Sequence, residues 1–461
     1  MVEIAASEAT SADAADTSPP RLTRSIGVLG GTLLTLSCLT PASSLFVIVP
    51  GLFATQGTGT VLTLVIAAVL CIGVACCYSE LGTLAPSSGG EYAMVGTVAG
   101  RLAAWLVFVI ALIVVMVVPP IMAIGTAQYL GSVLSMSHAI VGAVVMLLSV
   151  AMGLLQLRTN AWVTGAFMVL EVIAAGVVAV LGFAHRHRPA GTLIHAQAAG
   201  AHGATPLGAL TLISGLAVAL FVLQGFSTAV YLAEEMHRPR RTVMRSVLWT
   251  LAIGAVVIIV PTAAVTLGAP DLQALANGDL VAMITDWSNS ATATFISLCI
   301  ALAIINATIV MVIQNSRVLY ASARDRAWPE PVNRVLSGLN RFGAPWMATL
   351  AVGVPGALLC FVDLTLLNEV TSVVIAVLYL VVALAALTTR GARHRDTPAW
   401  RMPGWPVIPL VVIAVLIYVM ARQPLSALAI TGGVVLLAVL YWVLYLRRRP
   451  HDRWLISVPA D

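Results

Sequence analysis

The side chain best placed for chemistry is Glu171, an acidic residue inside an apolar segment. It lies in the stretch VTGAFMVLEVIAAGVVAVLGF, about ten residues after an apolar run begins at position 161. At 1.5 Å per residue this is about 15 Å deep, near the centre of a bilayer. A carboxylate there costs about 2.5 kcal/mol or more unless it is paired, hydrated or protonated. Three roles follow: a proton carrier, the partner of a bound cation or of the first membrane helix, or a structural hydrogen-bond acceptor.

Two clusters of small polar residues interrupt other apolar runs. One reads SCLTPASS at positions 37–44, and the other reads QGFST at positions 224–228. Pro41 lacks an N–H and clashes with the preceding turn, so we expect the first helix to break there. Non-helical backbone at membrane depth is tolerated only where it is buried in protein or lines a cavity. The alternative for each cluster alone is an ordinary proline kink or a glycine packing contact.

The two clusters fall in the first and sixth apolar runs, which are the first runs of two five-run halves. Interrupted helices in matching positions of two halves are typical of the substrate site of a transporter. Freed N–H groups at the start of a half-helix suit a carboxylate, and freed carbonyl groups at the end of one suit an ammonium. The pair therefore predicts a site for a zwitterion.

The composition places the whole chain in a membrane. Of its 461 residues, 60% are hydrophobic and 9% are charged, against about 25% charged in an average soluble domain. Apolar runs long enough to cross a bilayer predict an all-α protein with twelve transmembrane helices. The eleventh run is short and one aspartate separates the ninth from the tenth, so eleven helices is the alternative. The runs cover 25–53, 57–84, 101–131, 138–157, 161–183, 207–236, 245–268, 291–319, 345–362, 364–388, 407–421 and 425–446.

The placement of arginine predicts the orientation. All 24 basic residues are arginine, and only Arg186, Arg188 and Arg422 fall on the predicted outer side. The positive-inside rule then predicts a multi-pass protein of the cell inner membrane with both termini in the cytoplasm. The predicted parts are a disordered cytoplasmic tail (1–20), a ten-helix transport core (21–388), helices 11 and 12 (389–446) and a cytoplasmic C-terminal tail (447–461).

Several other classes of protein lack support in the sequence. A net charge of +5 would suggest nucleic acid in a soluble protein, but topology explains it here. The six cysteines lie in apolar runs, and the histidines of the loop at 185–206 are irregularly spaced, so we expect no disulfide framework, metal site or cofactor. With neither a metal constellation in the membrane nor a phosphate-binding loop, we expect no enzyme.

Other polar residues lie near the predicted site or near the cytoplasmic ends of the helices. The eighth run offers Asn306, Thr308, Met311 and Gln314 as cavity-lining groups, with interhelical hydrogen bonding as the alternative. Glu80, Glu91, Glu234 and Glu235 lie near the predicted cytoplasmic interface and close to arginines. We expect structural or gating ion pairs there, worth about 0–1 kcal/mol each at a surface.

Four segments together carry a family resemblance. They are YSELGTLAPSSGGEYAMVGTVAGRLAAW (78–105), EEMHRPRRTVMRSV (234–247), NSRVLYASARDRAWPEPVNRV (315–335) and RMPGWPVIPL (401–410). In order and spacing the chain resembles permeases of the amino acid–polyamine–organocation superfamily. Two departures are Arg238 in place of an asparagine, and Ser43-Ser44-Leu45 in place of a Gly-Ser-Gly-like turn.

The resemblance implies a leucine-transporter-type 5+5 inverted repeat with broken helices 1 and 6, and alternating access around a site at the membrane midplane. It places the loops of the broken helices at 40–45 and 221–227, with Phe221 as an aromatic gate. Glu171 stands where many relatives carry a lysine implicated in proton coupling, and this chain has no lysine.

We therefore expect a secondary-active amino acid permease, proton-coupled or exchanging, with a polyamine, amine or amino-alcohol transporter as the alternative. Its partners would be a small amino acid or amine, a proton as coupling ion and the lipid bilayer. Glu171 is the candidate for proton coupling. The candidate substrate-binding residues are Ser37, Thr40, Ala42, Ser43, Ser44, Phe221, Gln224, Gly225, Ser227, Asn306 and Met311.

Overall fold

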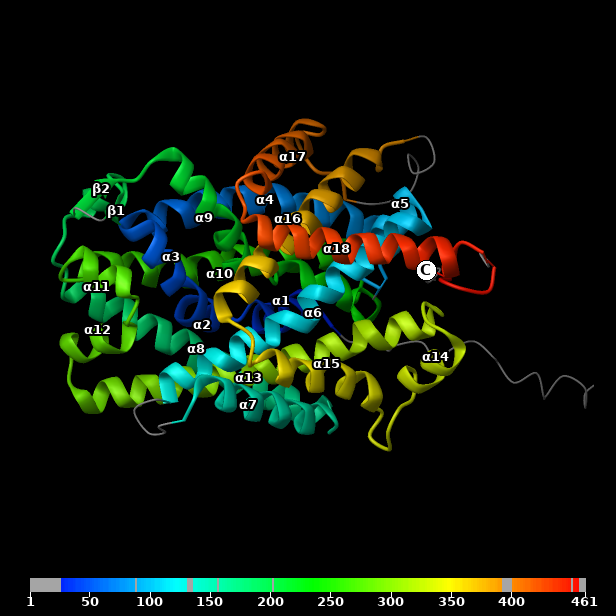
Figure 1. Cartoon of the computed structure of the whole chain (residues 1–461), viewed down its shortest axis with the longest axis horizontal. Helices are drawn as coiled ribbons and strands as arrows, with labels where there is room; N and C mark the ends of the chain where they lie inside the picture. Colours follow the sequence, from blue (N-terminus) through cyan, green and yellow to red (C-terminus); the bar gives the residue numbers. More distant parts are fainter. Residues whose placement is uncertain are drawn as a thin grey trace, which may run out of the picture.

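A computed structural model gives the fold of residues 26–87, 89–130, 136–155, 157–200, 203–391, 400–448 and 451–455. The predicted tail at 1–20 and part of the C-terminal tail lie outside these residues. Helices dominate the described chain, and its one sheet is a two-stranded hairpin (Figure 1). The structure is thus that of an all-α protein, as the apolar runs predict.

The first half of the chain contains one interrupted helix and four continuous ones, with short connecting elements. In order, the elements are α1 (Val28–Leu39), α2 (Pro41–Ser43), η1 (Ser44–Ile48), α3 (Val49–Gln56), η2 (Gly57–Gly59), α4 (Thr60–Leu84), α5 (Glu91–Ala99), α6 (Arg101–Leu130), α7 (His138–Gly153), α8 (Leu157–Ala184), η3 (Ala190–Leu193), β1 (Gln197–Gly200) and β2 (Gly203–Pro206).

The second half begins with another interrupted helix. Its elements are α9 (Ala209–Val222), η4 (Phe226–Glu235), α10 (Pro239–Gly268), α11 (Leu272–Asn277), α12 (Leu280–Trp287), α13 (Ser290–Arg324), α14 (Glu330–Leu336), α15 (Trp346–Leu359), α16 (Leu364–Thr388), α17 (Val407–Met420), α18 (Leu425–Tyr441) and η6 (Trp442–Leu446). Every predicted apolar run coincides with a helix or with a series of helices.

Length and composition make these helices suitable for a membrane. In the described part of the chain, eight helical stretches are long and apolar enough to cross one, and α7, α15 and α17 are shorter apolar helices. The first stretch, Val28–Leu84, has 57 residues, more than twice the roughly 20 that one crossing needs. Gly57, with a φ of +54°, ends α3 within it. These features show a multi-pass membrane protein.

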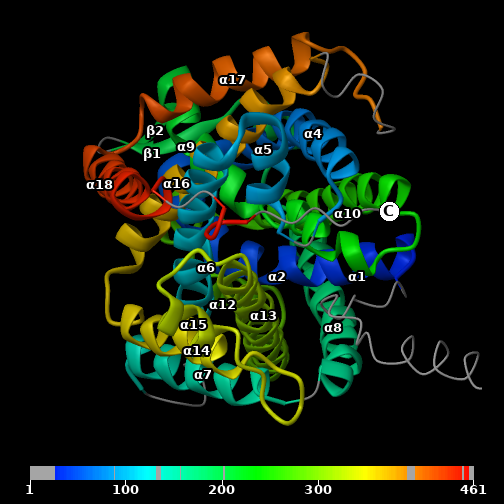
Figure 2. The same ribbon diagram turned by 90° about the vertical axis from the view of Figure 1, so that its right-hand side faces the viewer.

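The interrupted first helix lies in the middle of the molecule. Figure 2 shows α1 and α2 with α4 and α10 on one side and α8 and α13 on the other, and α1 or α2 contacts α8, α10 and α13 directly. A hydrogen bond joins the ends of the two interrupted helices. The N–H of His237, just after η4, donates to the carbonyl of Ile26, just before α1, at 2.8 Å. The two interrupted helices are therefore neighbours.

The connection between α8 and α9 contains a short hairpin. Its strands β1 and β2 pair antiparallel from Gln197↔Pro206 to Gly200↔Gly203. The hairpin is attached to the turn after the first interrupted helix, since the N–H of Gln197 donates to the hydroxyl of Thr58 at 2.8 Å. Short polar segments of this kind carry little periodicity, so the sequence gives no sign of the hairpin.

Candidate functional site

The first helix breaks at Thr40. The N–H of Thr40 closes α1 by donating to the carbonyl of Leu36 at 3.0 Å, and Thr40 itself has a φ of +47°. A left-handed conformation is uncommon for a β-branched residue and marks a strained position. Pro41 then starts a helix that continues through α2, η1 and α3 to Gln56. Proline suits this first position because its missing N–H would have no partner there. The helix therefore breaks beside Pro41, as predicted, and Pro41 begins the second half-helix.

Glu171 of α8 caps this second half-helix. Its Oε1 accepts hydrogen bonds from the N–H groups of Ala42 at 2.9 Å and Ser43 at 3.4 Å. Its side chain is buried, with 3% exposure. The first N–H groups of a helix lack partners within the helix and carry its positive dipole end, so a carboxylate is favourable here. The contact with the first membrane helix, one of the alternatives for Glu171, is present.

One turn before Glu171 on the same helix, Met168 also contacts the first interrupted helix. The hydroxyl of Ser37 lies 3.4 Å from the Met168 sulfur and donates to the Leu33 carbonyl at 3.0 Å. Residues three apart share one face of a helix. This face of α8 therefore contacts the first interrupted helix on both sides of the break. Nothing in the sequence indicated that Met168 takes part in this contact.

The second interruption touches the first. Helix α9 ends at Val222, and η4 begins after Gly225, whose φ is +124°. A Cβ atom on Gly225 would lie 2.4 Å from the Cα of Leu39 and 2.8 Å from its nitrogen. Only glycine allows both this φ and this approach. The candidate residues from positions 37–44 and 224–227, far apart in sequence, thus lie at one junction.

Three hydroxyl groups at this junction have no hydrogen-bond partner among the residues that the structure describes. They belong to Thr40, Ser43 and Ser227, whose residues are at most 1% exposed. Buried polar groups are paired in most proteins, and one left unpaired costs about 1–3 kcal/mol. Three together make the junction a candidate site for a polar ligand. The hydroxyl of Ser44, by contrast, donates to the Leu39 carbonyl at 3.3 Å.

The remaining candidates lie close to the junction in the chain or on helices that contact it. Phe221 is buried in the last turn of α9, and Gln224 lies in the turn before Gly225, donating its N–H to the Phe221 carbonyl at 3.0 Å. Asn306 and Met311 are buried on α13, which packs against α1 and α2. Thr308 of the same helix donates its hydroxyl to the Ile304 carbonyl at 3.0 Å.

An aromatic cluster borders the second interruption. The ring of Phe226, the first residue of η4, lies 6.2 Å from the ring of Tyr78 and 5.9 Å from that of Tyr379. The two tyrosine rings are 6.1 Å apart, all three in edge or tilted arrangements that aromatic pairs favour. Sequence reasoning missed Tyr78 and Tyr379. Both stand in helices whose periodicity gives no reason to pair them.

The hydroxyl of Tyr78 connects this cluster to Glu91 of α5 by a hydrogen bond. Glu91 accepts hydrogen bonds from Tyr78 at 3.2 Å and from Tyr231 of η4, and only 2% of it is exposed. Among the described residues Glu91 forms no ion pair with an arginine, contrary to the prediction, and its two carboxylate oxygens accept from tyrosine hydroxyls. The side chains of Glu234 and Glu235 lie outside the described part of the chain.

Glu80 forms the ion pairs expected of it. Its carboxylate lies 3.4 Å from Arg390 and 3.3 Å from Arg401, and it accepts the Met402 N–H at 2.9 Å. The Thr389 hydroxyl also donates to it at 2.9 Å. Glu80 is fully buried, so these contacts join α4 to the end of α16 and to the segment before α17.

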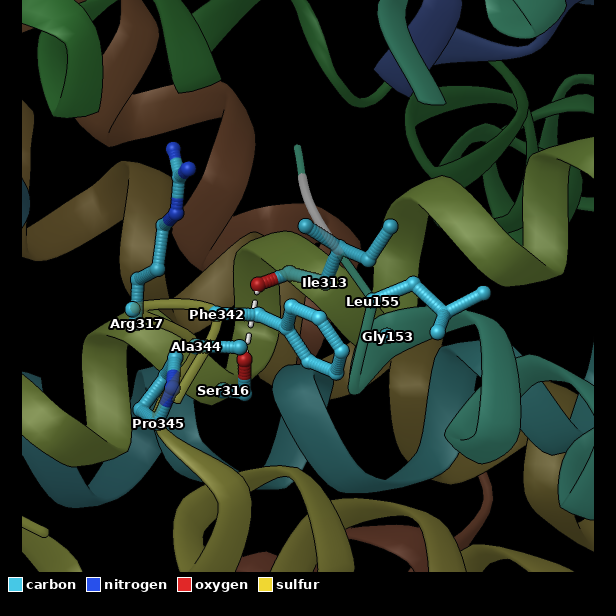
Figure 3. Close-up of a pocket in the computed structure, with 9 residues that line it drawn as sticks. Gly153, Leu155, Ile313, Ser316, Arg317, Phe342, Ala344 and Pro345 are labelled. Atoms are coloured by element: carbon cyan, nitrogen blue, oxygen red, sulfur yellow. Dashed lines mark hydrogen bonds between the residues drawn. The ribbon is translucent and has the colours of Figure 1, made fainter. Parts of the chain in front are cut away.

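A small pocket of about 70 Å³ lies elsewhere, beside the end of α7 and the C-terminal part of α13 (Figure 3). It contains none of the predicted site residues, and its Ser316 hydroxyl is already bonded to the Ile313 carbonyl at 2.8 Å. Its lining consists of Gly153, Leu155, Ile313, Ser316, Arg317, Phe342, Gly343, Ala344 and Pro345. Among the described residues, no group of three histidine, cysteine or acidic side chains could hold a metal ion.

Sequence comparison identifies the family to which this arrangement belongs. Residues 26–445 match the family described as "Amino acid permease". The chain belongs to the amino acid permease family. The resemblance to amino acid–polyamine–organocation permeases is thereby confirmed, and the protein is a membrane transporter rather than an enzyme.

Relatives match over nearly the full length of the chain. It is 22% identical to the branched-chain amino acid permease BcaP of Bacillus subtilis, covering 95% of this chain and 96% of that protein. It is 28% identical to an uncharacterized transporter of Mycobacterium tuberculosis, over 90% of each. It is 21% identical to the methylthioribose transporter of Bacillus subtilis, over 92% of this chain and 91% of that one.

Proposed function

We propose that the protein is a secondary-active amino acid permease whose substrate binds at the junction of the two interrupted helices. The observation that carries the proposal is the direct contact of Leu39 with Gly225 beside three unpaired buried hydroxyl groups. Hydroxyl groups without partners inside a membrane protein are costly, and a polar ligand removes that cost. Family membership supports a small amino acid as the ligand.

We propose twelve membrane crossings in two inverted halves of five, followed by two more. Counting α1 to α3 as one crossing and α9 with η4 as another, each half has its interruption in its first crossing. Arginine placement supports an inner-membrane orientation with both termini in the cytoplasm. Such a repeat supports alternating access, because one half can rock against the other around a fixed central site.

The chemistry of the junction suits an amino acid. The N–H groups of Ala42 and Ser43 stand at a half-helix start and can bind a carboxylate, while the carbonyls that end α1 can accept from an ammonium. Phe221, Gln224, Asn306 and Met311 would surround the side chain. The name of the Bacillus subtilis relative favours branched-chain amino acids, and Glu171 is the candidate for proton coupling.

The alternative is an amine, polyamine or amino-alcohol, or another solute without a carboxylate. Two observations favour it: a carboxylate of the protein already occupies the half-helix start, and one relative is named a methylthioribose transporter. A neutral or cationic solute would leave Glu171 in its place.

Uptake into proteoliposomes tests the proposal. With the interior alkaline, we expect the protein to accumulate labelled L-leucine, L-isoleucine or L-valine, and the Gly225→Ala variant to accumulate none. Accumulation of putrescine or methylthioribose without any amino acid would favour the alternative. Absence of accumulation and exchange with every solute would contradict both readings.

A further inference from the structure

The site proposed for the substrate carboxylate is already filled in this structure. The N–H groups of Ala42 and Ser43 both point to one oxygen of Glu171, at 2.9 Å and 3.4 Å. The half-helix behind them is long, since α2, η1 and α3 continue without interruption from Pro41 to Gln56. The dipole and the free N–H groups of this half-helix therefore form an anion-binding site, and the side chain of Glu171 occupies it.

A second observation indicates that this site also receives a ligand. The hydroxyl of Ser43, one of the residues that hold the Glu171 oxygen, is fully buried and has no partner in the described part of the chain. The hydroxyl of neighbouring Thr40, at 1% exposure, has none there either. The Oε2 atom of Glu171 makes no hydrogen bond with the described part of the chain. The Oε2 atom of Glu171 can thus still accept a hydrogen bond, and the hydroxyls of Ser43 and Thr40 can still donate one.

An amino acid cannot simply join this arrangement. Its carboxylate would need the same two N–H groups and would lie against the carboxylate of Glu171. Two anions in a buried site of low dielectric repel each other strongly, and one of them then takes up a proton or leaves.

We propose that Glu171 fills the anion site of the empty transporter and that the substrate carboxylate replaces it. This inference rests on the proposed function. In the exchange, Glu171 forms an O–H bond with a proton that leaves a hydronium ion, and its hydrogen bonds from Ala42 and Ser43 pass to the substrate. The neutral carboxyl then donates to a hydroxyl oxygen left unpaired at the junction, such as that of Ser43. On release, Glu171 gives the proton back to water and caps the half-helix again.

No other ionisable group in the described part of the chain is paired with Glu171, so Glu171 itself takes up the proton in this exchange. The elements packed against α8 are α1, α2, α10, α12 and α13. In the described part of the chain, none of their ionisable groups forms an ion pair or hydrogen bond with Glu171. The innermost of these groups along each helix are Cys38 on α1, Arg245 on α10, Asp286 on α12, and Cys299 and Arg317 on α13; α2 has none.

The exchange gives the permease a definite coupling. Each zwitterionic substrate enters with one proton, so one positive charge crosses the membrane in each cycle. The empty transporter meanwhile keeps its anion site closed by Glu171, which prevents the half-helix from binding unrelated anions. Specificity for a ligand with a carboxylate then follows from the displacement, because a solute without one cannot replace Glu171 at the N–H groups.

Binding of L-leucine to the purified wild-type protein tests the proposal without any variant. In weakly buffered solution at pH 9 to 10, leucine should cause the protein to take up close to one proton per bound molecule, and its apparent Kd should rise up to tenfold per pH unit. Leucine binding without proton uptake would overturn the proposal and leave the proposed function standing. Absence of binding of leucine, isoleucine and valine at every pH would overturn both.

Two variants locate the proton. In Glu171→Gln, leucine should bind without proton uptake, with a Kd that is independent of pH. In Asp286→Asn, which removes an exposed carboxylate from α12, proton uptake should match the wild type. Proton uptake that persists in Glu171→Gln would contradict the proposal. A well-folded Glu171→Gln protein that no longer binds leucine would also contradict it, because Glu171 would then hold the substrate rather than compete with it.

Discussion

Gly225 is packed against the backbone of Leu39 so closely that a single added carbon would lie 2.4 Å from the Leu39 Cα. The interruption between α9 and η4 is thereby packed against the interruption between α1 and α2. Leu39 is also held from the other side, since a Cβ on Gly254 of α10 would lie 2.7 Å from its Cδ1. This contact brings together two helix breaks that lie far apart in the chain.

Gly225→Ala should abolish transport. The substitution combines a clash with backbone strain at a φ of +124°, and strain of this kind costs about 1–3 kcal/mol. We expect uptake in proteoliposomes to fall at least tenfold and the melting temperature to drop. Gly432→Ala is the control, because a Cβ there meets nothing within 4 Å. The control variant should be slightly more stable than the wild type, because Gly432 lies in a helix. Wild-type transport in both variants would show that the contact between Gly225 and Leu39 is not needed for transport.

Removal of an unpaired hydroxyl at the junction should separate stability from function. In Ser227→Ala the empty protein should become more stable by about 1 kcal/mol, because a buried unsatisfied group disappears. Substrate affinity should nevertheless fall several-fold. Thermal unfolding with and without L-leucine measures both effects.

The matched control for this experiment is Ser149→Ala in α7. Its buried hydroxyl donates to the Val145 carbonyl at 2.8 Å, so its removal brings no comparable gain in stability and no change in affinity. Equal behaviour of the two serine variants would show that the Ser227 hydroxyl has no special role.

The sequence predicted where the two helices break but not how the breaks meet. Pro41 and Gly225 have local effects on the backbone, so the breaks could be placed from residue types alone. The hydrogen bond from Ala42 to Glu171 joins residues 129 positions apart. Such a contact depends on how α8 packs against the first helix, which apolar periodicity does not determine. The pairing of Tyr78 with Tyr379 was missed for the same reason.

Replacement of Glu80 should destabilise the fold without acting on the substrate. In Glu80→Ala, two arginines lose their common partner, and breaking a buried ion pair costs about 3–5 kcal/mol. The arginines are 32% and 29% exposed, which screens them partly, so we expect about 2 kcal/mol. The double variant with Arg401→Ala should lose less than the sum of the single losses. Additive losses would show that the two side chains do not interact.

Glu91 should make stability depend on pH. It lies in α5, outside the candidate membrane spans, and burial raises the pKa of its carboxyl, which the hydrogen bonds from Tyr231 and Tyr78 offset only in part. The folded protein then holds this proton to a higher pH than the unfolded chain does. Its contribution is fully present below the usual carboxyl pKa and is lost as the pH rises through the raised value.

Thermal unfolding between pH 4 and pH 8 measures this effect. The melting temperature of the wild type should fall relative to that of Glu91→Gln as the pH rises, since the amide has no proton to lose in this range. Parallel curves for the two proteins would exclude Glu91 as the titrating group. Glu330→Gln, on the short helix α14, is a control without the buried tyrosine contacts.

The most direct test of the central claim is a cryo-electron microscopy map of the purified protein with L-leucine bound. We expect ligand density at the junction between Pro41 and Gly225, with its carboxylate at the N–H groups of Ala42 and Ser43 and with Glu171 turned away from them. Density for leucine elsewhere, for example in the pocket beside Phe342, with Glu171 still bonded to Ala42, would contradict the account.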